Sequence, residues 1–377
     1  MGSISRILLA AAIVTAAGAC RGKDKARRAP ANGAEVKLAA APAPVADLGF
    51  VTGSVWLGEE RDHRVRPLRL DPKTGAWVAQ GGGEVDLFPT DLIRKGDLLV
   101  IAAQGATEAD HVEQLAVIRG GAVAFFGPRG PAVRNPSASK TGAVLVVEAN
   151  VDGHHDLYRI ELDGRVARLS LTPEGNFEPA VSPDGEVIAF ASSRDGQAEI
   201  YRMPAAGGPA TRLTSFHKDD WSPQWSADAT QLAFLSDREG TPRVFVMAPD
   251  GTGQRRVSDD HQPETVEDRP RWAPIGAALA FLAGKPAAPV LAVVEGGKVR
   301  TLTPSGSADT DFAWSPGGQH LAVVRHPVTA GGLGPAEIVF VRVSDAQVIG
   351  KAAPPAGTPR VLRWVAGTGT ATGRSPQ

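Results

Sequence analysis

The sequence predicts an all-β protein, a β-propeller, on the strength of three observations. A short pattern recurs through most of the chain at a nearly constant spacing. The 43 glycines and 30 prolines mark many turns around an ordinary apolar content of 42%. After residue 50 no long segment combines a 3.6-residue apolar period with freedom from Gly and Pro. That absence disfavours stacked helical repeats, the structural alternative of similar period.

The repeat is clearest over residues 179–190, PAVSPDGEVIAF, and weaker copies follow Asn135, Trp225, Trp272 and Trp314. Each copy holds four short β-rich runs separated by Asp-Gly or Gly-Gly turns, which supply the positive φ of tight hairpins. Four strands per unit at this period is typical of a propeller blade. Equivalent anchors are 43, 44, 47 and 42 residues apart, at Ser139, Ser182, Ser226, Ala273 and Ser315.

The two ends of the chain are expected to share one blade. Residues 54–79 resemble strands two to four of a blade without a first strand, and Arg360–Trp364 resembles a first strand. Joining them closes the ring and leaves no free sheet edge at the seam. Seven blades result, or six if the N-terminal segment is not a blade. The predicted blades are this composite one and residues 88–127, 136–172, 179–215, 223–258, 270–303 and 313–350, within a propeller domain of residues 49–366.

The N-terminus has the layout of a secretory signal. Arg6 precedes the apolar run Ile7–Ala17, and small residues lead into Cys20, the only cysteine of the chain. The segment resembles a bacterial lipoprotein signal, although Ala17 stands where that pattern usually has Leu or Val. The resemblance implies a signal peptide over residues 1–19 and a lipid on Cys20. An ordinary cleaved signal with an incidental cysteine is the alternative.

The regions beside the predicted propeller are not expected to pack. Residues 20–48 are rich in Ala, Pro, Lys and Arg, which predicts a flexible basic tether, and residues 367–377 should form a disordered tail. Arg21 stands where some bacteria place the Asp that retains a lipoprotein at the inner membrane. That resemblance favours the outer membrane, on its periplasmic face or at the surface.

Charge and motifs exclude several function classes. Residues 51–377 hold 33 basic and 38 acidic side chains, the wrong balance for general attraction to nucleic acid. A single cysteine excludes disulfides within the domain. No Gly-x-Ser-x-Gly elbow, phosphate loop, dinucleotide fingerprint or His-Glu-x-x-His motif is present. No catalytic residue, cofactor or metal ligand is therefore assigned, and a binding protein is favoured over an enzyme.

Acidic residues in the predicted interblade connections are the candidate binding site. Such connections gather around one mouth of a propeller channel, where carboxylates would steer a basic peptide or hold Ca²⁺. The plainer interpretation is that they are solvated or hydrogen-bond strand ends. The candidates are Glu178, Asp219, Asp220, Glu267, Asp268, Asp309 and Asp311. The recurring tryptophans are interpreted as blade packing rather than a ligand cage; they are Trp225, Trp272, Trp314 and Trp364.

The repeat resembles that of the TolB-like propellers, a WD40-like repeat also called PD40. The resemblance lies in the Trp-Ser-Pro-Asp-Gly-like element, the Arg194-Asp195-Gly196 turn and Glu199-Ile200-Tyr201, and it covers residues 136–325. It implies a monomeric interaction platform that binds an envelope protein or peptide at its channel mouth. The tether-like residues 20–48 do not suggest the N-terminal α/β domain of TolB, so TolB's own role is not assigned. The alternative function is a metal-dependent hydrolase or a carbohydrate-binding propeller that uses the same mouth.

Overall fold

The computed structural model describes residues 48–366 apart from 62–63, 81–84, 95–96, 106–109, 120–121, 162 and 260–261. Over these residues the chain forms 29 strands joined by turns and irregular segments. Within this described part, no helix has the length and apolar character needed to cross a bilayer. The predicted signal peptide, Cys20, the tether up to residue 47 and the C-terminal tail lie outside the described residues.

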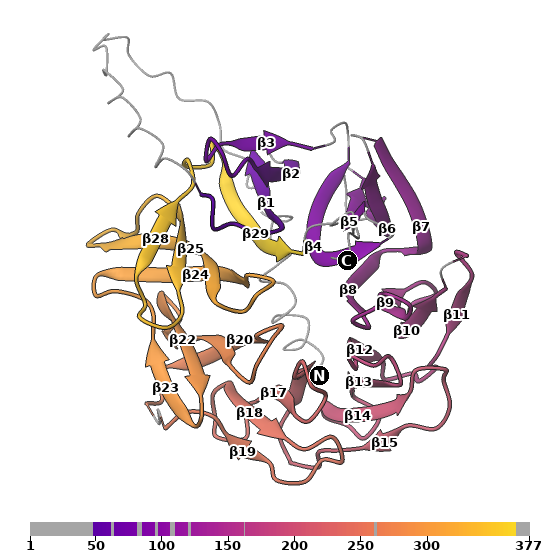
Figure 1. Ribbon diagram of the computed structural model, residues 1–377. Helices are drawn as coiled ribbons and strands as arrows, with labels where there is room; N and C mark the ends of the chain where they lie inside the picture. The colour runs from indigo at the N-terminus through magenta and orange to yellow at the C-terminus, as the bar shows by residue number, and fades with distance from the viewer. Residues whose placement is uncertain are drawn as a thin grey trace, which may run out of the picture.

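The strands form seven separate sheets arranged radially around a central axis (Figure 1). In each sheet one strand lies nearest the axis and the others follow outward in antiparallel order. The predicted all-β class and the predicted count of seven blades are both confirmed.

The first blade combines the two ends of the propeller, as predicted. Its innermost strand, β29, pairs with β1 in a register that places Leu57 opposite Leu362 and Trp56 opposite Arg363. The ring is thereby closed by hydrogen bonds rather than left with two open edges. This blade consists of β29 (Thr358–Val365), β1 (Ser54–Arg61), β2 (Arg64–Leu70) and β3 (Trp77–Ala79).

The other six blades follow in chain order around the ring. Blade 2 contains β4 (Asp86–Arg94), β5 (Asp97–Gln104), β6 (Val112–Arg119) and β7 (Ala122–Gly130). Blade 3 contains β8 (Ala132–Ala138), β9 (Leu145–Asn150), β10 (His155–Ile160) and β11 (Val166–Arg168). Blade 4 contains β12 (Asn176–Val181), β13 (Val187–Ser192), β14 (Glu199–Pro204) and β15 (Thr211–Arg212).

Blades 5 to 7 repeat the arrangement, with one short extra strand in the last. Blade 5 contains β16 (Asp220–Trp225), β17 (Leu232–Ser236), β18 (Arg243–Met247) and β19 (Arg255–Arg256). Blade 6 contains β20 (Val266–Trp272), β21 (Leu279–Lys285), β22 (Ala288–Glu295) and β23 (Lys298–Thr301). Blade 7 contains β24 (Ser307–Trp314), β25 (His320–Thr329), β27 (Glu337–Arg342) and β28 (Val348–Lys351), with β26 (Gly332–Leu333) beside β25.

The second and third strands of the blades form the core. In β17 and β18 every residue is buried, which is why these segments read as continuous apolar runs rather than as an alternation. The repeat's central aromatic position is filled by Phe190, Phe234 and Phe281, all fully buried. Burying such a ring stabilises the fold by roughly 1.5–3 kcal/mol. The recurring aromatic residue therefore stabilises each of these blades.

The innermost strands begin earlier than the sequence pattern predicts. Blade 4, for example, starts at Asn176 rather than at residue 179, and blade 5 at Asp220 rather than at 223. The reason is a β-bulge, which adds unpaired residues inside each of these strands and interrupts the two-residue alternation. The polar residues placed in connecting loops by the sequence therefore belong to strands.

The turn after the innermost strand is built around one serine. In blade 4 Ser182 Oγ accepts a hydrogen bond from Val187 N at 3.0 Å and donates to Asp184 Oδ1 at 2.5 Å. In blade 5 Ser226 and Asp228 repeat the serine–aspartate bond at 2.6 Å. Gly185 closes the turn at φ 81°, a conformation that favours glycine. These turns form the face of the propeller opposite the predicted acidic mouth.

Candidate functional site

In each of blades 3 to 7, one polar residue of the innermost strand stands at or beside the bulge. Four of these residues have φ between 50° and 54°, an uncommon conformation for residues other than glycine. In blade 7 the unpaired residue is Thr310, and Asp311, which pairs with Val324, corresponds to the others by its place three residues before the tryptophan. We call this set the bulge ring; it consists of Asn135, Glu178, Ser222, Arg269 and Asp311.

Hydrogen bonds link neighbouring members of the bulge ring on the side of blades 3 to 5. Glu148 Oε2 of blade 3 accepts from Asn135 Nδ2 at 2.9 Å and from the Glu178 backbone N at 3.0 Å. Glu178 Oε2 in turn accepts from the Ser222 backbone N at 2.7 Å and from Ser222 Oγ at 3.1 Å. The positive-φ backbone thus turns its amides toward carboxylates of the preceding blade.

The two carboxylates on this side have different acidities. Burial and the charge of Glu148 raise the pKa of Glu178 to about 7, although its bonds from Ser222 oppose the shift and Asp268 adds to it. Burial also acts on Glu148, but the hydrogen bond and charge of His155, at 2.9 Å, lower the pKa of Glu148 on balance. Glu178 is therefore the group of this side whose charge changes near neutral pH.

Arginines surround the bulge ring on the side of blades 6, 7 and 1. Asp311 Oδ1 lies 3.1 Å from both Arg269 Nη1 and Arg271 Nη2, and its Oδ2 lies 3.7 Å from Arg363 Nη1. The same Oδ2 accepts the Leu362 backbone N of β29 at 2.8 Å. Burial alone would favour the neutral acid, but the three arginines lower the pKa of Asp311 to about 2. One carboxylate is thus surrounded by three cations.

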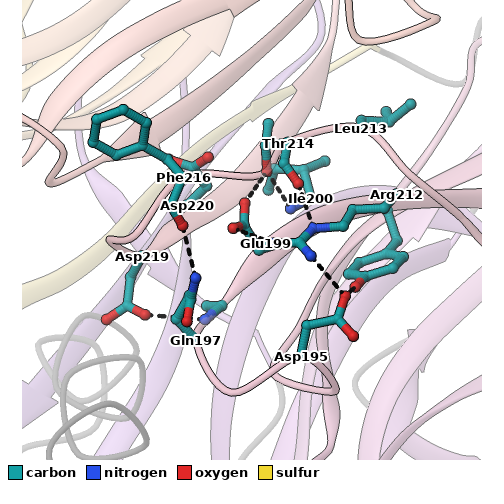
Figure 2. Close-up of polar contacts among 12 residues, drawn as sticks. Asp195, Gln197, Glu199, Ile200, Arg212, Leu213, Thr214, Phe216, Asp219 and Asp220 are labelled. Carbon is teal, nitrogen blue, oxygen red and sulfur yellow. Dashed lines mark hydrogen bonds and ion pairs between the residues drawn. The ribbon is translucent and has the colours of Figure 1, made fainter.

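Asp219 and Asp220 hold blades 4 and 5 together (Figure 2). Asp219, just before β16, accepts from Ala198 N at 3.0 Å. Asp220 is fully buried, and its Oδ2 pairs with Arg238 at 2.8 Å. Burial raises the pKa of Asp220 to about 6, and the nearby charge of Glu199 adds to the shift while Arg238 opposes it. These two residues are structural partners rather than open ligands.

Three further candidates lie in β20 and β24. Glu267 is buried, accepts from Val244 N at 2.7 Å and bonds Ser258 Oγ. Asp309 is buried and paired with Arg325 at 2.7 Å. Asp268 differs, because its side chain is 41% exposed beside Arg269.

Six of the seven candidate carboxylates thus lie in strands rather than in connecting loops, and their role in binding stays a prediction. Only Asp219 lies outside a strand, and the buried candidates are neutralised by arginines and backbone amides. Glu178 and Asp268 keep exposed surface. Sequence reasoning also missed the arginines at 269, 271 and 363, whose only signal is their place near the repeat tryptophan.

The recurring tryptophans donate hydrogen bonds from their indole N–H groups, in most cases to the neighbouring blade. Trp225 Nε1 donates to Ala180 O at 3.0 Å, and Trp314 Nε1 to Arg271 O at 2.9 Å. Trp272 repeats the bond to Gln224 O at 3.1 Å. Trp364 instead bonds Thr52 O at 2.7 Å and contacts Phe340 edge-on. Trp225 and Trp272 are only partly buried, whereas the other two are buried.

No resident ion site is evident in the part of the chain that the structure describes. There, no three His, Cys, Asp or Glu side chains gather as they would around a metal. Asp311 and Glu178 use carboxylate oxygens on arginines and amides, whereas Asp268 keeps exposed surface.

Comparisons with known proteins agree with this architecture. A family model described as the TolB beta propeller domain, PD40, matches residues 168–333. A curated relative, tricorn protease homolog 1 of Streptomyces coelicolor, is 43% identical over 60 residues, which is 16% of this chain and 6% of that protein. The chain thus spans a small part of that relative's length.

Two solved structures show the same fold at low sequence identity. TolB of Acinetobacter baumannii is 16% identical, with a TM-score of 0.52 over 80% of this chain and 78% of its own. The oligogalacturonate lyase of Vibrio parahaemolyticus is 9% identical, with a TM-score of 0.56 over 82% of this chain and 88% of its own. The chain is therefore a seven-bladed β-propeller whose repeats match the model of the TolB beta propeller domain, PD40, over residues 168–333.

Proposed function

We propose that this protein is a lipid-anchored envelope propeller that binds a segment of a protein or peptide partner at its channel. The Cys20 signal pattern and the basic residues of 20–48 support a tether to the outer membrane. A single anchor with a polybasic segment fits the two signals that stable membrane attachment requires. The propeller body would then be held near the membrane as a monomeric binding platform.

The bulge ring is the observation that carries this proposal. It contains partly exposed side chains of both charges, Glu178 and Arg269, and Asp268, Arg271 and Arg363 lie beside it. Complementary charge mainly sets specificity and association rate. A partner segment that carries both a basic and an acidic group fits this arrangement better than a purely basic one.

Capture from the native envelope tests the proposal. The fragment 49–377 is used as bait beside a double variant, Glu178→Gln with Asp268→Asn, and we expect the variant to lose the partner recovered by the parent. The matched control, Asp163→Asn with Asp250→Asn, removes two exposed carboxylates from outer turns and should keep it. Recovery of no partner, or equal loss in both variants, would count against the proposal.

The alternative function is a hydrolase or a carbohydrate-binding propeller that uses the same channel. It is distinguished by turnover, because a substitution of Asp268 or Asp311 would then abolish a measurable reaction or sugar binding without affecting protein capture. The likeness to a lyase concerns the fold alone at 9% identity. The interaction role is therefore preferred.

A further inference from the structure

A cleft lined by both polar and apolar groups lies between blades 6 and 7 on the face away from the interblade connections, and we infer that it binds a small ligand carrying a carboxylate or phosphate group. Its volume is ≈ 430 Å³, within the range of small-molecule sites. The turn at 275–278 forms one wall and the turn at 318–320 the other, with the ends of β22, β23 and β27 between them. The site is separate from the bulge ring and independent of the proposed function.

The arginine that bridges blades 6 and 7 comes from the fourth strand rather than from the third. In blades 3 and 4 a third-strand arginine reaches the next blade, Arg159 to Ala205 O at 3.0 Å and Arg202 to Pro249 O at 2.9 Å. Blade 6 has Val293 in that register, opposite Ala280 as Arg202 is opposite Ala189. Arg300 of β23, which pairs with Val293, makes the contact with the next blade instead.

The turns that border the cleft have lost the carboxylates of the repeat. Blades 4 and 5 carry Asp184 and Asp228 in their serine turns, but the equivalent positions in blades 6 and 7 are Ile275 and Gly317. Ile275 is 64% exposed. This sector of the face is therefore less acidic than its neighbours, and it offers an apolar surface beside the cations.

Two guanidinium groups supply the donors. Arg300 uses two of its N–H groups on Val343 O at 2.8 Å and Ser344 O at 3.3 Å, which leaves others of its five donors. Arg342, 44% exposed, pairs at 2.8 Å with Asp345 beside the cleft. The half-buried His320 lies between the blades.

The balance of charge favours an anion. Glu295 lines the cleft as the acidic counterpart of Arg300 and Arg342, and Asp345 is already engaged by Arg342. Guanidinium groups match carboxylate and phosphate geometry with paired hydrogen bonds. The exposed Ile275 would contact an apolar part of the same ligand, so a small organic acid suits the cleft best.

Titration calorimetry of the full chain tests the inference, with sodium succinate and inorganic phosphate as probes and NaCl at equal ionic strength as the blank. We expect saturable binding of at least one probe by ~5 mM, a weak-site concentration. Binding of both probes shows that the site recognises either oxyanion. Binding of only one probe shows whether the site takes a carboxylate or a phosphate. Absence of saturable heat from either probe would overturn the inference.

Two variants separate the site from general charge effects. Arg342→Gln should weaken binding at least about tenfold, whereas Arg165→Gln, an exposed arginine that pairs with Asp163 in a comparable turn, should leave it unchanged. Gly317→Asp restores the repeat's turn carboxylate, and a Cβ at this position meets nothing within 4 Å. We expect it to melt like the parent and to lose anion binding. Unchanged affinity in this folded variant would contradict the site.

Discussion

Blades 3 and 4 meet through a pair of polar side chains, and blades 4 and 5 meet through an equivalent pair. The two pairs differ in charge. In the first, Asp156 of β10 accepts from Asn176 Nδ2 of β12 at 3.1 Å and pairs with Arg168. In the second, the equivalent residues are Glu199 and Asp220, two buried carboxylates. One contact joins an acid to an amide, and the other places two acids together.

Hydrogen-bond donors surround the two buried carboxylates of the second contact and stabilise their charges. Glu199 accepts from Arg212 Nη2 and Thr214 Oγ1, both at 2.6 Å (Figure 2). Asp220 has Arg238 at 2.8 Å, just as Asn176 has Arg194 at 2.8 Å. Burial, with a smaller contribution from the charge of Glu199, still raises the pKa of Asp220 to about 6 against these donors. The two contacts therefore share their geometry, but a neutral amide in one is replaced by a carboxylate in the other.

The largest difference between the two contacts should appear when their arginines are removed. Arg238→Met leaves the buried Asp220 carboxylate without its cation, which costs about 3–5 kcal/mol of unfolding free energy. Arg194→Met removes a bond to a neutral amide and should cost about 1–2 kcal/mol. Both arginines lie over buried aromatic rings, so loss of cation–π contact is shared. Urea unfolding at pH 7 measures both, and equal losses would contradict the comparison.

Converting the first contact into the second is expected to have the next largest effect. Asn176→Asp places a buried carboxylate beside Asp156 and should lower stability by about 2–3 kcal/mol at pH 7. The loss should shrink toward pH 4, because protonation removes the repulsion. A loss that is independent of pH would indicate a steric rather than an electrostatic cause.

Converting the second contact into the first should change the pH dependence of stability. The folded pKa of Asp220, about 6, lies above the ordinary Asp pKa of 3.8, so the folded state holds the proton more tightly. Stability of the parent is then lost as pH rises from about 4 to about 6, by about 3 kcal/mol at most. Asp220→Asn should flatten this slope and match or exceed the parent at pH 8. An unchanged slope in chemical unfolding between these pH values would refute the assignment.

Added Ca²⁺ should have the smallest effect. The carboxylates of the bulge ring and of both contacts bond arginines and amides, so the cation finds few free oxygens. Millimolar Ca²⁺ should leave the melting temperature of the parent unchanged. A clear rise that is lost in Asp268→Asn would instead support a bound ion.

The blades could be predicted from the sequence because their signals are local. The buried runs of β13, β17 and β21 and the serine turns that precede them recur as short patterns. The start of β16 was missed because a bulge breaks its alternation, and the paired segments resume only at Gln224. Closure by Arg360–Trp364 was predictable because that segment ends in the repeat's tryptophan.

The site could be predicted only as a set of acidic residues near one end of the blades. Their neutralisation depends on side chains remote in sequence, such as Arg363, which lies 52 positions after Asp311 in another blade. The bridge that Arg300 makes between blades 6 and 7, where the third strand has Val293, is likewise visible only once the strand registers are known.

Truncation of β29 tests the closed seven-bladed ring most directly. A chain that ends at residue 357 lacks the innermost strand of blade 1, with the buried Leu362 and Trp364, and leaves the edge of β1 unpaired. A chain that ends at residue 366 keeps this strand and serves as the control. The ring predicts a sharply lower melting temperature for the first and an unchanged one for the second; equal melting temperatures for both would contradict it.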